Sequence, residues 1–372
     1  MQKQFSVLQE DKNSSKSALK VNKGIEQPSP FNPNAASMFK DTKPGLMTAG
    51  EYAEGIKSGN RTILSKAITL IESSLPRHQR LADEIMELCL PYSGNSIRIG
   101  ITGVPGVGKS TFIEALGKQL TSSGHKLAVL AIDPSSKKTK GSILGDKTRM
   151  EELATDPDAF IRPSPSAGSL GGVAKKTKEI IVLCEAAGFD TIFVETVGVG
   201  QSETAVHSMV DFFLLLMLAG AGDELQGIKR GIMEMADAIV INKADGDNKN
   251  MAELAKREYK NALHLFPPTQ SGWIPFVDTC SAREKKGIGE IWEKIREYET
   301  LTKNNGYFEK RRKEQELKIM FETIKEYLDD NFRNNSSVKA MLPEIENKVM
   351  NGNISSYKAA RELLDVFFKN IG

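Results

Sequence analysis

Cysteine is scarce in this sequence. The 372 residues contain three cysteines, Cys89, Cys184 and Cys280, which form no CxxC pair and no cluster with histidine. A disulfide framework and a structural zinc site both need several cysteines at suitable spacing, so the sequence disfavours both. Few, scattered cysteines are typical of a reducing compartment, and we expect a cytoplasmic location.

Long hydrophobic runs and an excess of positive charge are also missing. The longest apolar run, residues 212–219, is of strand length, whereas a helix that spans a bilayer needs about 20 apolar residues. No apolar stretch follows the first residues, so no secretory signal is expected. Lysine and arginine number 50 against 48 acidic residues, whereas nucleic-acid binding usually leaves a basic excess. We therefore expect no membrane and no nucleic-acid partner.

The sequence divides into four parts. Residues 1–46 are polar and without periodicity, which predicts a disordered tail; a fusion remnant or a degenerate targeting segment are the alternatives. Residues 47–94 predict three helices, the first opened by the capping-box pattern of Thr48 and Glu51, the second starting near Asn60 and the third following Pro76. Residues 95–304 alternate strands with helices, and residues 305–372 are helical.

Buried strands that alternate with helices predict an α/β fold, a mostly parallel sheet with helices on both faces. The segment from Arg162 to Gly172 contains two prolines and three glycines and is interpreted as a loop. The expected strands are residues 97–101, 127–132, 190–195, 212–218, 238–241 and 274–277.

The last part of the chain carries a helical apolar stripe. It consists of Leu317, Met320, Phe321, Ile324, Tyr327 and Leu328. Their spacing is that of one face of a helix, and such a face needs a partner surface. Packing on the chain's own globular domain and contact with a second copy are both open.

A phosphate-binding loop follows the first expected strand. Gly103-Val104-Pro105-Gly106-Val107-Gly108-Lys109-Ser110 matches GxxxxGK[ST], with Thr111 next. Glycines let several backbone N–H groups point at one anion, and the following helix adds its dipole. We expect Lys109 to reach the β- and γ-phosphates and the Ser110 hydroxyl to bind Mg²⁺.

A guanine-recognition motif follows the fifth expected strand. Asn242-Lys243-Ala244-Asp245 has the NKxD form, in which the carboxylate accepts hydrogen bonds from guanine N1–H and the exocyclic amino group. Adenine would leave that carboxylate unpaired. Ser281-Ala282-Arg283 comes after the sixth strand and fits the companion loop at the guanine carbonyl. Taken alone, such a tetrapeptide also suits a simple turn, and an ATPase is the alternative for this motif together with the phosphate loop.

Glu195-Thr196-Val197-Gly198 ends the third expected strand and is similar to the DxxG element of GTPases. A carboxylate there holds Mg²⁺, and the Gly198 N–H would contact the γ-phosphate. The next residue is Val199, where Ras-like GTPases have a glutamine that orients the attacking water. We therefore expect slow intrinsic hydrolysis that depends on another group or on a partner.

Two further loops lie at strand ends. Asp133 closes the second strand, and the polar, glycine-containing loop after it includes Asp146; both acids are candidates for the metal or the water, although the loop suits an exposed basic loop as well. Gly220–Lys229 follows the fourth strand and is interpreted as a mobile element, with helix-start glycines and a solvated lysine as the alternative.

Taken together, these segments resemble the MeaB/ArgK family of P-loop GTPases, of the SIMIBI class, which includes the methylmalonic aciduria type A protein. The resemblance covers roughly residues 47–370. The shared text is GVPGVGKST at 103–111, DPSS at 133–136, GSILGDKTRM at 141–150, ETVGVGQSE at 195–203, GAGDELQGIK at 220–229 and NKAD at 242–245.

The resemblance implies a homodimeric GTPase that acts as a chaperone of an adenosylcobalamin-dependent acyl-CoA mutase, usually methylmalonyl-CoA mutase. It would gate cofactor loading from a cobalamin adenosyltransferase and protect the mutase, without binding cobalamin itself. Asp133, Asp146 and Glu195 would be the acids near Mg²⁺, and the C-terminal helices the dimerisation arm. The family's partner-sensing switch would comprise Asp223, Glu224, Gln226 and Lys229, the last able to reach the nucleotide.

Three rival functions remain. A metal-insertion GTPase of the hydrogenase or urease type needs clustered cysteine or histidine, and His78, His125, His207 and His264 are scattered. A transport-linked kinase would prefer ATP, against the NKAD motif. A scaffold that uses GTP structurally is compatible with the sequence.

Overall fold

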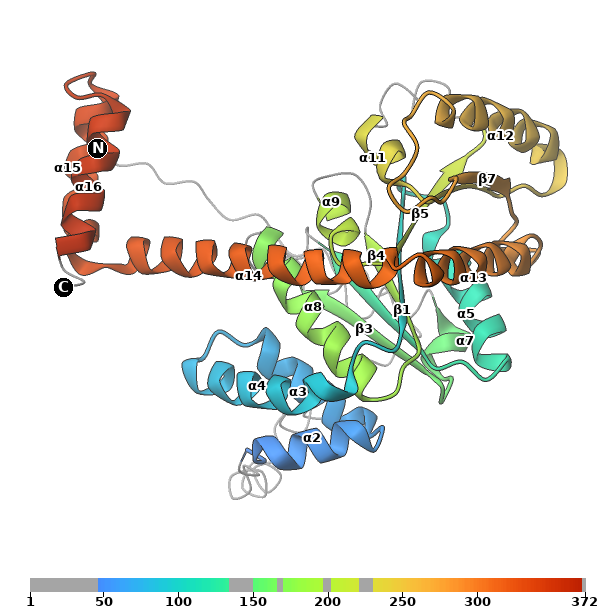
Figure 1. The fold of residues 1–372 in the computed structure, drawn as a ribbon, viewed down its shortest axis with the longest axis horizontal. Helices are drawn as coiled ribbons and strands as arrows, with labels where there is room; N and C mark the ends of the chain where they lie inside the picture. The colour runs from blue at the N-terminus through green and yellow to red at the C-terminus, as the bar shows by residue number, and fades with distance from the viewer. Residues whose placement is uncertain (1–45, 134–149, 166–169, 197–201, 221–229, 370–372) are drawn as a thin grey trace, which may run out of the picture. The chain divides into compact units, whose positions relative to one another are not determined.

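A seven-stranded sheet lies at the centre of the computed structural model, which describes residues 46–133, 150–165, 170–196, 202–220 and 230–369. Neighbouring strands are parallel throughout, in the order β3-β2-β4-β1-β5-β6-β7 (Figure 1). The strands are β1 (Ile97–Gly103), β2 (Leu127–Asp133), β3 (Ala159–Pro165), β4 (Thr191–Thr196), β5 (Phe212–Leu218), β6 (Ala238–Asn242) and β7 (Phe276–Thr279).

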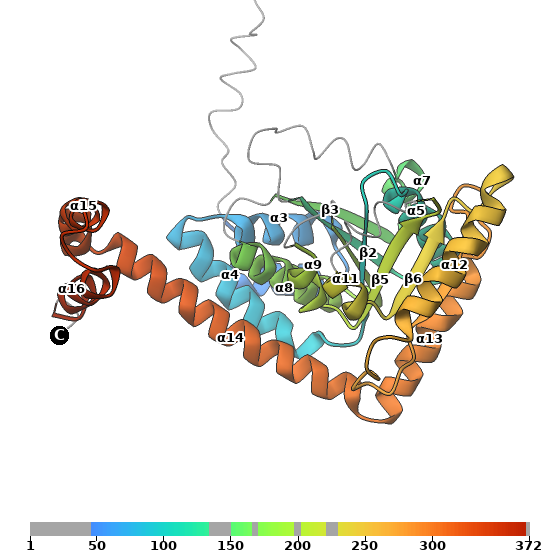
Figure 2. The same ribbon diagram turned by 90° about the horizontal axis from the view of Figure 1, so that it is seen from above.

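Helices cover both faces of this sheet (Figures 1 and 2), which confirms the predicted α/β class. The central strands are apolar at nearly every position because neither face meets water. One apolar core lies under α5 and α13, and a second lies under α11 and α12. The helices that follow the strands are α5 (Lys109–Ser122), α7 (Glu151–Ala154), α8 (Leu170–Ala186), α9 (Ser202–His207), α11 (Arg230–Met235), α12 (Lys249–Leu263) and α13 (Ile288–Asn304).

Six of the strands lie where the sequence predicts them, although β7 is shifted by two residues from the predicted 274–277. The interpretation of Arg162–Gly172 as a loop was wrong at both ends, and residues 166–169 lie outside the described part of the chain. Residues 162–165 belong to β3, and residues 170–172 begin α8. Within the described residues β3 pairs with β2 alone, in register from Ala159 to Pro165. Proline lacks an N–H and is tolerated at a sheet edge. Pro163 and Pro165 are two residues apart, so both ring nitrogens can face away from β2.

The three N-terminal helices form as expected: α2 (Ala49–Lys57), α3 (Arg61–Glu72) and α4 (Pro76–Cys89), followed by the short η1 (Leu90–Tyr92). The capping box at Thr48 is present, and the Asn60 side chain caps α3. All three helices pack against α8. The Arg162 guanidinium forms an ion pair with Glu72, which ties this segment to β3. The division of the chain into four domains stays a prediction.

The C-terminal helices are α14 (Tyr307–Asn334), α15 (Ser336–Met350) and α16 (Ser356–Lys369). The first turns of α14 bind the amino ends of the strands. Arg312 pairs with the buried Asp211 through Nη2 and Oδ2 at 2.6 Å and donates to the Gly94 carbonyl at 2.6 Å. Further along, α14 passes α8 and ends beside α15 (Figure 1). No helix in the part of the chain that the structure describes is long and apolar enough to cross a membrane.

Candidate functional site

The predicted motifs meet at one edge of the sheet. Because all strands are parallel, the segments that follow them emerge at the same, carboxyl edge, where α/β proteins bind ligands. Gly103 ends β1, Thr196 ends β4 and Asn242 ends β6, and Ser281 lies two positions after the end of β7. Asp133 ends β2, so its backbone also reaches this edge.

The loop from Gly103 to Lys109 requires its glycines. A Cβ on Gly103 would lie 2.3 Å from the Leu216 carbonyl oxygen of β5, which is too close for any side chain. Gly108 has a φ of +93°, and a Cβ there would lie 2.9 Å from the Asn242 side-chain nitrogen. The positive φ and the close approach both favour glycine. The loop is therefore built against β5 and the Asn242 segment.

Lys109 is the first residue of α5, and only 8% of its surface is exposed. Its ammonium donates to the Gly103 carbonyl at 2.9 Å and to the Val104 carbonyl at 3.4 Å. These bonds hold the charge over the loop. A positive charge at the start of a helix is an arrangement that can bind an anion.

Asn242 and Lys243 connect the NKAD segment to the phosphate loop. The buried Asn242 amide donates to the Val107 carbonyl at 2.9 Å and accepts from the Ala282 N–H at 3.1 Å. Lys243, whose φ is +60°, donates through Nζ to the Gly106 carbonyl at 2.7 Å. Three segments distant in sequence are thus held in one arrangement.

Asp245 lies beside the predicted companion loop. The Ser281 hydroxyl donates to Asp245 Oδ2, and the same hydroxyl accepts from the Glu284 N–H at 3.1 Å. This chain of bonds orients the carboxylate. Ala282 is buried and Arg283 is exposed, so the two residues do not play the same part in this loop.

Glu195 is 7% exposed near the end of β4 and lies in register with Ile101 of β1. Beside it, the buried hydroxyls of Thr102 and Thr196 are 2.8 Å apart and join the ends of β1 and β4. The sequence analysis did not identify this threonine pair. The sequence shows only that Thr102 precedes the phosphate loop and that Thr196 follows Glu195.

The remaining predicted residues divide into two groups. Val104 packs on the core, Pro105 is exposed, and Ser110 and Thr111 lie in the first turn of α5. The predicted residues that lie outside the described part of the chain are Asp146, Gly198, Asp223, Glu224, Gln226 and Lys229.

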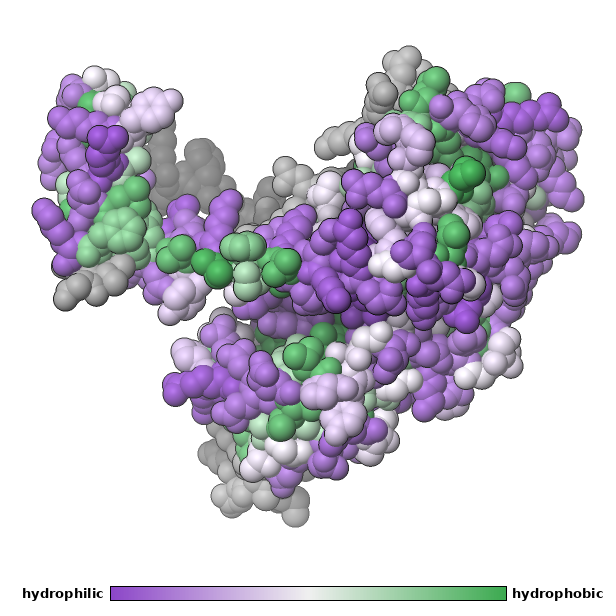
Figure 3. Space-filling model, in the orientation of Figure 1, coloured by the Kyte–Doolittle hydropathy of each residue, from purple (hydrophilic) through white to green (hydrophobic). Residues whose placement is uncertain are grey.

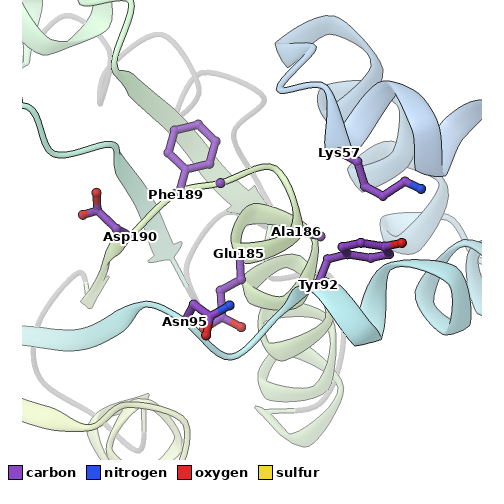
Figure 4. A pocket seen from close by; sticks show the side chains of 8 residues that line it. Lys57, Tyr92, Asn95, Glu185, Ala186, Phe189 and Asp190 are labelled. Atoms are coloured by element: carbon purple, nitrogen blue, oxygen red, sulfur yellow. The ribbon is translucent and has the colours of Figure 1, made fainter.

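A separate cavity of about 390 Å³ lies at the opposite, amino edge (Figure 4). It lies between Lys57 and Tyr92 on one side and Glu185, Phe189 and Asp190 on the other. The Glu185 carboxylate is already bonded to the Ser96 hydroxyl at 2.6 Å and to the Arg98 guanidinium at 2.8 Å. This cavity thus lies at the edge of the sheet opposite to the predicted motifs, and its carboxylate already has partners.

The three cysteines are free and buried. Burial raises the pKa of the Cys89 thiol to about 11 and of the Cys280 thiol to about 12. Such thiols are poor metal ligands and nucleophiles. Cys280 has a structural contact that the sequence analysis missed: its Sγ donates to Asn242 Oδ1 at 3.4 Å. This contact helps to fix the orientation of the Asn242 side chain.

Comparison with known proteins identifies the family. The family model described as "Methylmalonyl Co-A mutase-associated GTPase MeaB" matches residues 64–337. The GTPase ArgK of Escherichia coli is 50% identical over 288 residues, which cover 77% of this chain and 87% of the relative. The mitochondrial methylmalonic aciduria type A homolog of Mus musculus is 46% identical over 323 residues, 84% of this chain and 78% of the relative.

A solved structure gives the same result for the fold. The crystal structure of a protein named LAO/AO transport system kinase superposes with a TM-score of 0.70 at 39% identity, covering 86% of this chain and 99% of that one. The matched residues include both nucleotide motifs at the carboxyl edge of the sheet. This chain is a P-loop GTPase and belongs to the MeaB family.

Proposed function

We propose that this GTPase binds GTP across the carboxyl edge of its sheet, with the phosphates on residues 103–111 and the guanine on Asp245. The observation that carries the proposal is the pair of bonds from Asn242 to Val107 and from Lys243 to Gly106. They hold the base-recognition segment against the phosphate loop, so that one nucleotide can reach both. A backbone N–H of the loop Ser281-Ala282-Arg283 would face the guanine carbonyl oxygen. Because the N–H groups of Ser281 and Ala282 donate to the Lys286 carbonyl and to Asn242 Oδ1, the Arg283 N–H is the candidate.

Hydrolysis then depends on charges placed around the phosphates. The Lys109 ammonium would move from the loop carbonyls to the β- and γ-phosphate oxygens, where charge develops in the transition state. Ser110 and Glu195 offer the hard oxygen ligands that suit Mg²⁺, with Asp133 and Asp146 as further candidates. Neutralisation of phosphate charge is the chemistry that Mg²⁺ supplies there. Gly198 and Lys229 would contact the γ-phosphate side.

We further propose that the chain serves as a chaperone of an adenosylcobalamin-dependent acyl-CoA mutase, most simply methylmalonyl-CoA mutase. The family's description, which names that mutase, supports the partner. Val199 is apolar where many GTPases orient the water with glutamine, which favours slow hydrolysis until a partner completes the site. Asp223, Glu224 and Gln226 would sense that partner, and the GTPase would gate cofactor loading from an adenosyltransferase and protect the mutase.

Turnover of GTP and of ATP, each with and without methylmalonyl-CoA mutase, tests this function. We expect GTP to be hydrolysed slowly by the protein alone and at least about tenfold faster with the mutase, because a group supplied by a partner is worth about 10³–10⁵ in related systems. Bovine serum albumin at the same concentration is the control. Faster ATP turnover would favour the kinase alternative, and a GTP rate that the mutase leaves unchanged would remove the chaperone role.

The apolar stripe on α14 supports a homodimer. Apolar side chains are visible along α14 in Figure 3, and the predicted stripe is exposed, from 46% at Met320 to 70% at Tyr327. Residues 317, 321, 324 and 328 recur at the spacing of a helix–helix seam. A second copy of α14 would offer the same apolar stripe, as the interface of a twofold dimer requires.

Phe321→Glu tests the dimer. Burial of a phenylalanine is worth about 1.5–3 kcal/mol, so we expect the dimer dissociation constant to rise at least about tenfold. Sedimentation equilibrium measures it. Asp329→Lys is the control, because this exposed residue lies on another face of α14. An equal effect of the two variants would contradict the proposed seam.

A further inference from the structure

The short helix α9 lies between the nucleotide edge and the C-terminal helices. It begins at Ser202, six positions after Thr196, the last residue of β4. It packs against β1, which leads into the phosphate loop, and against β4, which contains Glu195. It also packs against α8 and α11. A change in the position of α9 would therefore displace residues of both strands.

Gly100 makes the contact between α9 and β1 unusually close. A Cβ on Gly100 would lie 2.9 Å from Val206 Cγ1 and 2.8 Å from Phe213 Cδ2. Val206 is fully buried at this contact. Gly100 lies three positions before Gly103, the start of the phosphate loop. Because packed interiors transmit small displacements, α9 and this part of β1 are expected to move together.

The other end of α9 is held by α14. Arg311 Nη2 lies 3.1 Å from His207 Nε2 and 3.5 Å from the His207 carbonyl oxygen. Gln315 donates through Nε2 to the Val210 carbonyl at 2.9 Å, just beyond the helix. The rings of His207 and Phe213 also lie nearly perpendicular to each other, with centroids 5.5 Å apart. Two side chains of α14 thus hold the last residue of α9 and the segment that follows it.

The hydrogen bond between Arg311 and His207 can run in only one direction. Arginine can only donate, so Nε2 accepts and the ring proton lies on Nδ1. The ring is therefore neutral in this contact. Burial, with help from the neighbouring Arg311 charge, lowers the pKa of His207 to about 4, which keeps it neutral near pH 7.

Arg311 is itself fixed from the other side. Its Nη1 donates to the Tyr298 hydroxyl at 3.3 Å and lies 4.0 Å from the Asp237 carboxylate. The Tyr298 hydroxyl in turn donates to the Asp211 carbonyl at 2.8 Å. The Arg311 side chain is only 12% exposed. These contacts attach it to α13 and to the segments just before β5 and β6. Arg311 therefore forms a rigid link between these elements and α9.

We propose that Arg311 is a positioning residue for GTP hydrolysis, which acts by holding His207 and so fixing α9 beside the strands that carry the phosphate loop and Glu195. This inference rests on the GTPase activity and not on the identity of the mutase. It also means that α14, whose outer stripe is the proposed dimer seam, is connected to the hydrolytic side of the molecule.

His207→Leu tests the proposal by removing the acceptor while keeping an apolar side chain against Phe213. We expect the single-turnover rate of hydrolysis at saturating GTP to fall about five- to tenfold, a loss of roughly 1–1.4 kcal/mol in transition-state stabilisation. The dissociation constant of GDP should change less than about twofold. Faster hydrogen exchange of the α9 amides should accompany the lower rate.

Two variants separate positioning from general stability. His207→Gln keeps an acceptor for Arg311 and should restore at least half of the rate. Thr302→Val removes a buried hydroxyl that donates to the Tyr298 carbonyl at 2.8 Å within α13, and it leaves the side chains of Arg311 and His207 in place, so its rate should stay near that of the unaltered protein. An unchanged rate in His207→Leu would overturn the proposal, as would equal losses in His207→Leu and Thr302→Val.

Arg311→Lys gives the same answer if His207→Leu does not fold. A single ammonium keeps the charge near Asp237 but cannot bond both Tyr298 and His207, since it lacks the planar fork of arginine. We expect a similar fall in the single-turnover rate, again with GDP affinity retained. A rate equal to that of the unaltered protein would show that His207 needs no such partner.

Discussion

We expect that replacing Lys109 by methionine lowers the rate of GTP hydrolysis by about 10²- to 10³-fold, the usual effect of removing one donor that stabilises charge developing in a transition state. Methionine keeps the length and the apolar stem of this buried side chain and removes only the ammonium that now binds Gly103 and Val104. The measurement is single-turnover hydrolysis at saturating GTP, so that weaker binding does not enter the rate.

Lys118→Met is the matched control for this variant. Lys118 lies on the same helix, where its ammonium pairs with Asp156 and Thr121 shares the same carboxylate, away from the phosphate loop. We expect a lower melting temperature for Lys118→Met and an unchanged rate of hydrolysis. A Lys109→Met protein that hydrolyses GTP within about tenfold of the normal rate would assign the essential charge to another residue.

Asp245→Asn should change the preferred base from guanine to xanthine. The aspartate would accept two hydrogen bonds from guanine, and bonds to a charged group are worth about 1.5–3 kcal/mol each, so we expect GDP to bind about 10²- to 10⁴-fold more weakly. The asparagine amide can donate to the carbonyl that xanthine has in place of the amino group. Xanthosine diphosphate should therefore bind the variant more tightly than GDP does.

Dissociation constants for GDP and xanthosine diphosphate, measured by fluorescence with labelled nucleotides, decide this prediction. Asp247→Asn is the control, because this exposed carboxylate lies two residues further on in η2 (Gly246–Asn248). It should leave both affinities unchanged. If Asp245→Asn retains the normal affinity for GDP, then Asp245 does not recognise the base, and the contact with Ser281 is structural only.

Local patterns predicted most of the fold. Strands such as β5 are apolar at every position and bounded by turns, so six of seven could be assigned from the sequence. β3 could not, because Pro163 and Pro165 are typical of loops. They are compatible with a strand only because β3 lies at the edge and pairs with β2 alone in the described chain. That position is a property of the tertiary structure.

The nucleotide motifs could be predicted for a similar reason. Each is a short contiguous segment placed directly after a strand. The contacts that hold the motifs together could not be predicted, because Asn242 and Val107 are 135 positions apart and Arg311 and His207 are 104 apart. No local pattern marks His207 as the partner of a distant arginine. Only the fold brings such side chains together.

The prolines of β3 also affect how the molecule can meet its neighbours. A free sheet edge usually exposes a row of N–H and C=O groups to which a strand of another molecule can bond, a frequent route to aggregation. At positions 163 and 165 this outer row has no N–H to offer. An incoming strand would lose two consecutive donor positions on that side. The β3 edge is therefore protected against strand addition.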